Sequence, residues 1–383
     1  MTSINIPKNV TSIGYDVFSD CSKLSSVNIP EGISSIKKNL FSSCSNLKSI
    51  IIPESVKSIG YYAFSGTGLT SIYIPKNVTS IGYDAFSGCS KLISVNIPEG
   101  ISSIASCLFS SCSNLESITI PESVKSIENY AFQNTGLTSI NVSENITYIG
   151  SGAFSGCSSL TSINISTNNK AFKSKEGVLF NYIENELICY PAGKRDSYSI
   201  PSDVEKIRDC AFSGCIYLSS ITIPSSVKSI GDSAFSNCLN LSSLIIENGV
   251  KSIGNNAFYN CTELSSIIIP SSVKSIGDSA FYNCLNLSSV TYNGINDPGI
   301  DSNAFDNCNK LIKVNVPVNY NGDTFCGKNI IRMQTEPIVT NSNTVIIATT
   351  VSIVAILIIA GIVVICFLHK KSTSKYEDEN VQV

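Results

Sequence analysis

The 383-residue chain carries 26 Lys and Arg residues against 29 Asp and Glu residues, which gives a formal net charge of −3. This balance argues against nucleic acid as a partner, because a phosphate backbone is neutralised by a basic face. The chain has no Trp and a single histidine, His369, and only 14% of its residues are charged. This composition is unusual for an enzyme, and the length alone would suggest two or three globular domains.

A short repeat overrides that division into domains. From residue 2 the pattern I-P-x-x-V-x-S-I-G-x-x-A-F-x-x-C-x-x-L-x-S-I-x-I returns every 22 to 24 residues, and it continues to about residue 317. Its apolar residues alternate over short stretches and show no period of 3.6, so we expect short strands. A single coil cannot bury its own apolar side, but stacked coils share one core. The sequence therefore predicts for residues 1–317 a repeat solenoid of about 13 coils, built mainly from short parallel β-strands with little helix.

Phenylalanine marks the register of the coils, and one interrupted coil lies between the seventh and eighth of these residues. The aligned phenylalanines are Phe18, Phe41, Phe64, Phe86, Phe109, Phe132, Phe154, Phe212, Phe235, Phe258, Phe281 and Phe305. Residues 2–69 and 70–137 are near-duplicates, a block of three coils that is present twice.

Ten of the fifteen cysteines follow the phenylalanine by three residues: Cys21, Cys44, Cys89, Cys112, Cys157, Cys215, Cys238, Cys261, Cys284 and Cys308. A residue that recurs with the repeat indicates a small buried side chain in each coil. Disulfides between stacked neighbours are the alternative. The paired spacings typical of zinc sites are absent. The other five cysteines, Cys107, Cys189, Cys210, Cys326 and Cys366, fall outside this position.

Residues 166–200 interrupt the rhythm of the repeat. Two apolar and aromatic runs, residues 177–182 and 186–191, flank a short polar segment, and this arrangement predicts a β-hairpin. The hairpin is either a structural interruption or a ligand-binding protrusion. In the second case Lys194 and Arg195, beside Tyr198, form its basic rim.

The C-terminal part of the chain predicts a membrane anchor. Residues 318–344 are expected to form a C-terminal cap and juxtamembrane linker. Residues 345–368 include no charge over 24 positions, enough for one transmembrane α-helix. The positive residues of segment 369–383 follow at once, so this tail is expected to be cytoplasmic and the repeats extracellular, on a single-pass protein of the plasma membrane. The N-terminus starts within a coil and lacks the features of a signal peptide, so either the C-terminal helix directs insertion or the gene model is truncated.

Eight N-x-S/T sequences support exposure to a secretory compartment and are candidate N-glycosylation sites. They begin at Asn9, Asn77, Asn141, Asn145, Asn164, Asn240, Asn260 and Asn286.

The longer strand of each coil presents an outward position whose residue varies from coil to coil. Variation on a constant scaffold is how repeat proteins build extended binding faces, and apolar or aromatic residues anchor such faces. An ordinary β-surface with β-favouring side chains is the alternative. The candidate ligand-binding residues are Ile51, Tyr73, Asn96, Thr119, Thr222, Ile245 and Ile268. A second row is basic and is interpreted as a solvated edge that resists strand aggregation: Lys57, Lys125, Lys228, Lys251 and Lys274.

No arrangement of residues indicates catalysis, and we expect no enzyme, cofactor or metal site. The single histidine lies beside the predicted membrane segment, which leaves no Ser/His or Cys/His relay among the repeats. No pair of carboxylates is singled out for glycoside hydrolysis.

The repeated pattern resembles the BspA-type (Treponema pallidum-type) leucine-rich repeat family, and the apolar C-terminal segment is similar to that of trichomonad members. The resemblance implies a leucine-rich-repeat solenoid and a surface antigen. The expected function is a cell-surface adhesin or receptor that binds host or extracellular-matrix proteins. The alternatives are a structural surface-coat antigen without a specific ligand and an endocytic or signalling receptor that uses the tail.

Overall fold

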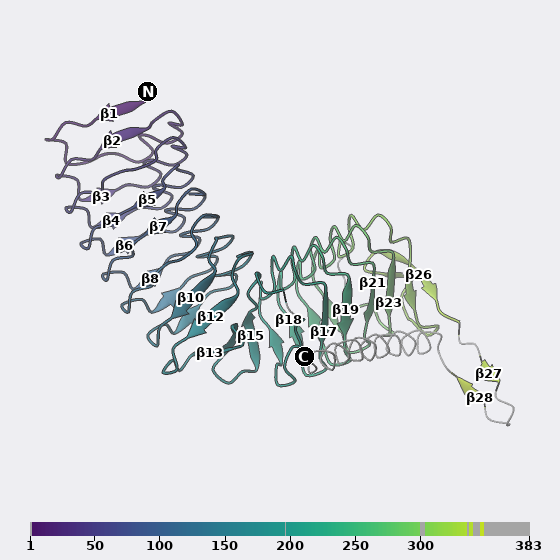
Figure 1. Ribbon diagram of the computed structural model, residues 1–383. Coiled ribbons are helices and arrows are strands. Elements are labelled where there is room, and N and C mark those ends of the chain that lie inside the picture. Colours follow the sequence, from purple (N-terminus) through teal and green to yellow (C-terminus); the bar gives the residue numbers. More distant parts are fainter. Residues whose placement is uncertain (1, 196, 299–302, 335–336, 340–344, 348–383) are drawn as a thin grey trace, which may run out of the picture.

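The computed structural model describes residues 2–195, 197–298, 303–334, 337–339 and 345–347. All regular elements in these residues are short β-strands, and none is a helix. The strands follow one another in parallel register from coil to coil, so the predicted parallel-strand solenoid of about 13 coils is confirmed. Figure 1 shows two arms of stacked coils that meet at an angle near β13 and β15.

Most coils contribute to two columns of strands. Strands of two to four residues form the main column: β1 (Ser3–Asn5), β2 (Ser26–Asn28), β5 (Ser71–Ile72), β7 (Ser94–Val95), β10 (Ser139–Val142), β12 (Ser162–Ile165), β17 (Ser220–Ile223), β19 (Ser243–Ile246), β21 (Ser266–Ile269), β23 (Ser289–Tyr292) and β24 (Val314–Val316). Their inward side chains are isoleucine, leucine or valine, apart from Tyr292 in β23, and their outward ones are mostly polar.

Two-residue strands form the short column: β3 (Ser35–Ile36), β4 (Ser58–Ile59), β6 (Ser80–Ile81), β8 (Ser103–Ile104), β9 (Ser126–Ile127), β11 (Tyr148–Ile149), β16 (Lys206–Ile207), β18 (Ser229–Ile230), β20 (Ser252–Ile253) and β22 (Ser275–Ile276). In each of them the isoleucine is buried.

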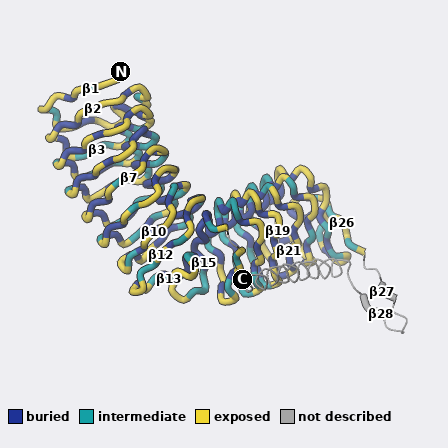
Figure 2. The backbone as a smooth tube through the Cα atoms, viewed as in Figure 1, coloured by how far each residue is buried: buried dark blue, intermediate teal, exposed yellow. Residues whose placement is uncertain are grey.

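The phenylalanines form a continuous stack of rings along each arm. Phe64 and Phe86 lie with ring centroids 5.5 Å apart and planes 1° from parallel, and Phe258 and Phe281 lie 5.2 Å apart. These rings are buried. Stacked pairs of this kind contribute about 0.5–1.5 kcal/mol each beyond the burial of their area. Figure 2 shows the buried residues lining the inside of every coil.

Left-handed backbone lies on both sides of the phenylalanines from Phe18 to Phe281 and also follows Phe305, with φ between 53° and 75°. Asn, Asp and Gly adopt this conformation most readily, which explains their frequency beside the phenylalanine. Two residues before it stand Asp16, Asn39, Tyr62, Asp84, Cys107, Tyr130, Gly152, Cys210, Ser233, Asn256 and Ser279. Two residues after it stand Asp20, Ser43, Gly66, Gly88, Ser111, Asn134, Gly156, Gly214, Asn237, Asn260, Asn283 and Asn307.

The glycine that follows the short-strand isoleucine in the repeat pattern is required because the preceding coil approaches it closely. The Asp232 carboxylate accepts a hydrogen bond from the Asn255 N–H at 2.8 Å, and it lies directly over Gly254. A Cβ at Gly254 would stand 2.5 Å from the Asp232 Oδ1 and 2.7 Å from its nitrogen. The side-chain cap and the missing Cβ are therefore one feature, shared between neighbouring coils.

The interruption contains three strands, β13 (Phe172–Lys175), β14 (Val178–Asn181) and β15 (Glu186–Cys189). They pair antiparallel in sequence order, and β15 then pairs parallel with β16. Directly after β15, the Tyr190 N–H donates to the Ala211 carbonyl at 2.8 Å, and its ring stacks on Phe212 at 5.1 Å. Tyr190 thus takes the phenylalanine position of the interrupted coil.

The interruption acts as a wedge between the two arms. On the side of the phenylalanine loops, the Gly156 N–H donates to the Ser213 carbonyl at 3.0 Å, so the coils before and after the insertion touch directly. On the side of the strands, β14 and β15 separate them. The inserted thickness on one side explains the angle between the arms, and the buried side chains form two separate clusters that meet there.

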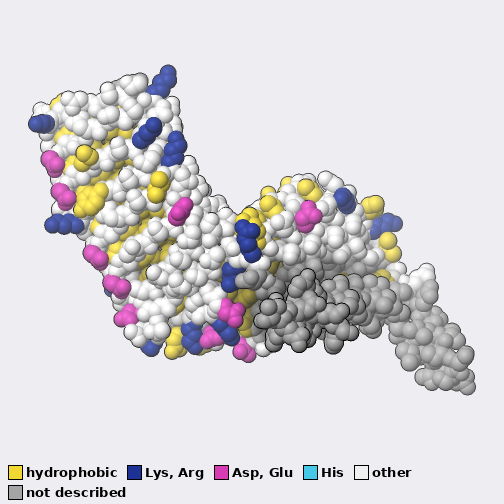
Figure 3. All heavy atoms as spheres, in the orientation of Figure 1, with side chains coloured by type: hydrophobic (Ala, Val, Ile, Leu, Met, Phe, Trp, Pro, Cys, Tyr) yellow, Lys and Arg dark blue, Asp and Glu magenta, His cyan; other side chains and the backbone are white. Residues whose placement is uncertain are grey.

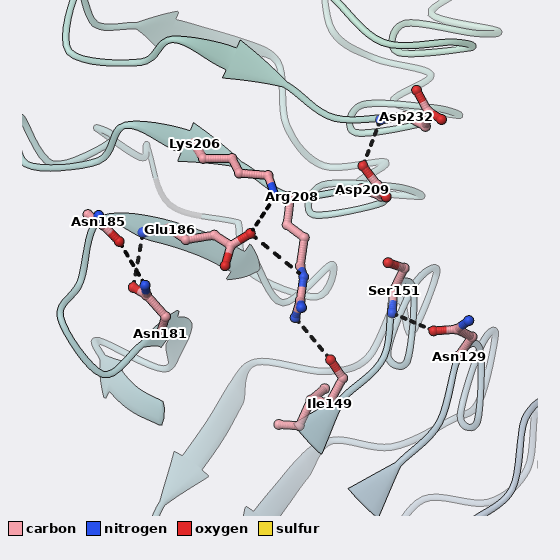
Figure 4. Close-up of polar contacts among 10 residues, drawn as sticks. All are labelled: Asn129, Ile149, Ser151, Asn181, Asn185, Glu186, Lys206, Arg208, Asp209 and Asp232. Carbon is pink, nitrogen blue, oxygen red and sulfur yellow. Dashed lines mark hydrogen bonds and ion pairs between the residues drawn. The ribbon is translucent and has the colours of Figure 1, made fainter. Parts of the chain in front are cut away.

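Arg208 connects the arms across this wedge and stands where most coils have the glycine (Figure 4). Its Nη1 donates to the Ile149 carbonyl at the end of β11, at 2.9 Å. Its Nε lies 3.8 Å from the Glu186 Oε1, which also pairs with the Lys206 Nζ at 3.0 Å. A long side chain fits here because β15 is followed directly by Tyr190 and provides no side-chain cap at this point.

The last described strands continue the main column and then leave it. They are β25 (Thr324–Phe325), β26 (Lys328–Arg332), β27 (Pro337–Val339) and β28 (Val345–Ile347). β26 pairs parallel with β24 and antiparallel with β25, and β27 pairs antiparallel with β28.

The prediction of a membrane helix falls mostly on residues that the structure does not describe. Its first three residues, 345–347, are described and pair as β28 with β27. The remainder, residues 348–368, and the tail 369–383 lie outside the described residues. Within the described part of the chain, no helix has the length and hydropathy needed to span a bilayer.

The shared cap gives a direct test. We expect Gly254→Ala to lower the free energy of unfolding by about 1–3 kcal/mol, because the added Cβ collides with the Asp232 backbone. Gly14 occupies the same position in the first coil, where the nearest atom to a Cβ is the Val17 Cγ2 at 3.5 Å. Gly14→Ala should leave stability unchanged or raise it by about 0.5 kcal/mol. Urea unfolding of both variants measures the difference, and equal effects would contradict the shared cap.

Candidate binding surface

The outward positions of the main column form one continuous surface, which we name the strand face. Register pairs place Asn141 opposite Asn164 and Thr222 opposite Ile245. At the C-terminal end the row continues through Thr291, opposite Ile268. The strand face therefore runs along both arms, one residue for each coil.

All seven predicted ligand-binding residues lie on this face with exposed side chains: Ile51, Tyr73, Asn96, Thr119, Thr222, Ile245 and Ile268. Two apolar pairs stand out among them. Ile51 is 84% exposed and Tyr73, in the next coil, is 61% exposed. Ile245 and Ile268 occupy neighbouring strands of the other arm, at 39% and 37%. Such side chains are available to anchor a partner, and neither pair is needed to close the core.

Asn96 has a different role from its apolar neighbours. Its Oδ1 accepts the Ile74 N–H at 2.8 Å, and its Nδ2 donates to the Ile74 carbonyl at 2.8 Å. Asn28 bonds Ile6 in the same way at 2.7 and 3.0 Å. Both amides thus clamp the backbone of the preceding coil, so the candidate residue Asn96 contributes to holding the stack together.

Thr119 lines a shallow hollow in the strand face, just before the wedge. The hollow has a volume of about 440 Å³. Asn141 and Asn164 also line it and are joined by a hydrogen bond from the Asn164 Nδ2 to the Asn141 Oδ1 at 3.0 Å. The carboxylate of Glu122 belongs to its lining. The surface is mixed, with amides, hydroxyls and partly buried isoleucines side by side.

None of the eight predicted glycosylation sites is buried: Asn9, Asn77, Asn141, Asn145, Asn164, Asn240, Asn260 and Asn286 are exposed or half-buried. Several amides are already engaged. Asn77 donates to the Glu54 carbonyl at 2.9 Å, and Asn240 donates to the Ile216 carbonyl at 2.7 Å. A glycan on Asn141 or Asn164 would occupy the hollow, so at these two positions modification and an open binding surface exclude each other.

Residues of the insertion make their own contacts beside the strand face. The ammonium of Lys173 lies 3.0 Å from the Glu184 carboxylate and 4.7 Å from the ring centre of Tyr182. The predicted basic rim is only partly assembled. Arg195 lies over the Tyr217 ring at 3.9 Å, whereas Tyr198 turns inward against Tyr190 and Phe212 and is half-buried.

Some surface residues were not found from the sequence. Ile331 extends the strand face, opposite Asn315. No phenylalanine aligns its coil, but the alternation around it could have shown it. Tyr61 and Tyr83, on the turn after the short strand, stack at 4.2 Å and are exposed. Figure 3 shows hydrophobic side chains across the N-terminal arm, with charged side chains mainly along its margins.

The cysteines that recur with the repeat are thiols of the core. The Cys261 thiol donates to the Phe235 carbonyl of the preceding coil at 3.3 Å, and burial raises its pKa from 9.0 to about 12. In two coils Thr67 and Thr135 take the same position, each bonded to the carbonyl of its phenylalanine. A thiol with a raised pKa is a poor nucleophile, because the thiolate is the reactive form. The described residues hold no group of three or more His, Cys, Asp or Glu placed to bind a metal ion.

Comparisons with known proteins agree with this architecture. The sequence matches a BspA type leucine rich repeat region, with six copies, over residues 1–93, 79–184 and 181–312. A leucine rich cell surface protein of Faecalibacterium prausnitzii is 34% identical, with a TM-score of 0.71, over 82% of this chain and 88% of that one. A leucine-rich repeat protein of Bacteroides ovatus is 29% identical, with a TM-score of 0.50, over 87% and 84%.

The pneumococcal vaccine antigen PcpA shares the fold at 23% identity, with a TM-score of 0.61, over 87% of this chain and 89% of that one. No curated protein matches the sequence.

The buried thiols predict a loss of stability at alkaline pH. The folded pKa of Cys261 lies above its ordinary value, so its contribution is complete below about pH 9 and is lost as the pH rises toward 12. By about pH 10.5 the loss should reach about 2 kcal/mol. The variant Cys261→Ser keeps a hydroxyl donor of similar size and lacks this titration. Urea unfolding between pH 8 and 10.5 should show a smaller decline for the variant than for the natural chain, and identical declines would contradict the assignment.

Proposed function

Because the chain belongs to the BspA-type leucine-rich repeat family, we propose that it is a cell-surface protein that binds a host or extracellular-matrix protein through the strand face. The observation that carries the proposal is the exposed apolar pair Ile51 and Tyr73 on an otherwise repetitive surface. The similar protein of F. prausnitzii, described as a leucine rich cell surface protein, supports the location.

The scaffold does not require any particular residue at the outward position of the main strands. The main strands are held by backbone hydrogen bonds and by inward aliphatic residues, so the outward residue is free to vary. Polar residues at this position would keep the surface soluble. Exposed isoleucine and tyrosine instead favour association, because burying them removes apolar area from water.

We also propose the arrangement in the membrane that the sequence predicts. Residues 345–368 provide the apolar segment, the tail 369–383 is cytoplasmic, and the repeats are extracellular. The function needs no enzyme activity, cofactor or nucleic acid. A protein partner is favoured over a small ligand because the strand face is long and open, and the hollows beside Thr119 and Ile331 are shallow.

A structural surface coat without a specific ligand is the second candidate. The duplicated block of residues 2–69 and 70–137 favours it, because duplication lengthens a projecting rod as readily as it multiplies a binding site. The two candidates differ in whether substitutions on the strand face change binding.

The binding proposal predicts saturable attachment of the purified full-length chain to extracellular-matrix proteins in a solid-phase assay. Replacing Ile51 and Tyr73 by Ser should weaken attachment at least tenfold, because both anchors lose their apolar area. The control is Ile93→Ser, an exposed isoleucine outside the outward position of the strand face. Attachment that does not saturate, or that both variants reduce equally, would favour the coat.

The membrane proposal predicts that protease added to intact cells expressing the chain degrades the repeats. An antibody against residues 369–383 should then detect a small protected C-terminal fragment, because the bilayer shields the tail. Permeabilising the cells should remove this fragment. A repeat region that survives on intact cells but not on permeabilised ones would show that it faces the cytoplasm and would refute the proposal.

A further inference from the structure

Three lysines are stacked directly upon one another at one edge of the C-terminal arm. Lys228, Lys251 and Lys274 follow the buried valine of three successive coils, and all three are exposed. The Lys251 N–H donates to the Lys228 carbonyl at 2.7 Å, and the Lys274 N–H donates to the Lys251 carbonyl at 2.8 Å. Their side chains therefore leave the backbone in register at the strand spacing of about 4.8 Å. We name these residues the lysine row.

Within the described part of the chain, the lysine row makes no ion pair. The ammonium groups of Lys228 and Lys274 donate to the carbonyls of Ser225 and Ser271 at 3.1 and 3.0 Å, which leaves further N–H donors on each. Of the three ion pairs found among the described residues, one lies within the insertion, and the two of Glu186 with Lys206 and Arg208 lie in the coil directly before Lys228. Like charges opposite one another in neighbouring strands repel, so the row is an unfavourable feature of the free protein.

Acidic residues near the row do not neutralise it. Glu205 occupies the same position in the preceding coil, where its carbonyl accepts the Lys228 N–H at 2.7 Å. Its carboxylate is not in an ion pair with the row. The Glu247 carboxylate accepts the backbone N–H of Ser225 at 2.8 Å. Three aligned positive charges therefore remain available to an external anion.

The repeat itself does not require lysine here. In the N-terminal arm the same position holds Ser34, Lys57 and Thr79 in successive coils, joined by the same backbone hydrogen bonds. Lys125 likewise stands alone, after Ser102. The solenoid forms equally with serine, threonine or lysine at this position. The run of three is thus a property of this surface rather than of the fold.

We propose that the lysine row binds a linear sulfated polysaccharide, laid along the axis of the C-terminal arm. The row is one residue wide and straight, which suits a narrow chain with anionic groups at short intervals. Hydroxyl groups flank it, because Ser229, Ser252 and Ser275 follow the lysines and pair in the short column. Sugar hydroxyls can exchange hydrogen bonds with these groups.

Other anionic partners fit less well. A protein segment would need apolar or aromatic anchors, and the residues flanking the lysines at this turn are mostly serines. A nucleic acid or a broad anionic surface would approach Asp209, Asp232 and Asp278, which line the same arm, and the chain has a net charge of −3. The row belongs to the turn before the short strands, so the polysaccharide leaves the strand face free for a protein.

The experiment measures binding of the purified full-length chain to immobilised heparin, with polyglutamate as the competing anionic polymer. In one variant Lys228, Lys251 and Lys274 are replaced by Ser. In the matched control Lys57, Lys76 and Lys125 are replaced by Ser, which removes the same charge from isolated positions. A third variant combines Lys251→Ser with Thr11→Lys, which breaks the row at constant net charge. Thermal unfolding confirms that each variant is folded.

We expect heparin affinity to fall at least tenfold in the row variant and less than twofold in the matched control. The charge-conserving variant should lose at least fivefold, and binding should weaken as ionic strength rises. Four results would each overturn the proposal: no heparin binding by the natural chain, equal losses in the row variant and its control, unchanged binding in the charge-conserving variant, or preference for polyglutamate over heparin.

Discussion

The structure depends on one constraint, that every coil completes its hydrogen bonds and its core only through the next coil. The Phe235 N–H donates to the Ala257 carbonyl at 2.7 Å, and the same bond recurs along each arm. The left-handed residues on both sides of the phenylalanine direct these N–H groups along the axis of the stack. Once this ladder is fixed, residues at equal positions in the repeat form straight columns, and each column has a single environment.

The sequence was sufficient to predict the positions that recur from coil to coil. It was insufficient to predict the places where one coil differs from the others. Alignment on phenylalanine found the core, the cysteine position and the strand face, because these depend on period alone. It did not identify the residue that takes the phenylalanine position in the interrupted coil. Tyr190 takes this position directly after β15, outside the regular spacing of the repeat. It placed Tyr198 beside the basic rim of the insertion, whereas the ring turns inward at the wedge against Phe212. Contacts that cross the insertion, such as the hydrogen bond from Arg208 to the Ile149 carbonyl, do not recur with the repeat, so its period cannot predict them.

Within one column the same position can serve the scaffold or the surface. Asn28 and Asn96 use both atoms of their amides on the preceding coil, whereas Ile51 and Tyr73 at the same position make the surface apolar. Both uses are compatible with the ladder, because an outward side chain is not needed to close it. Exposure and variability alone therefore overestimate a binding face, and the hydrogen bonds of each side chain decide which residues are available.

The wedge gives the two arms different surroundings although they are built from the same repeat. The N-terminal arm has the exposed pair Ile51 and Tyr73, while the C-terminal arm has the lysine row. A straight stack would present each column along one line. The insertion separates the strands but not the phenylalanine loops, so it changes the direction of every column at one point. A partner that follows the strand face across this point must bend with it, and a stiff linear polymer is confined to one arm.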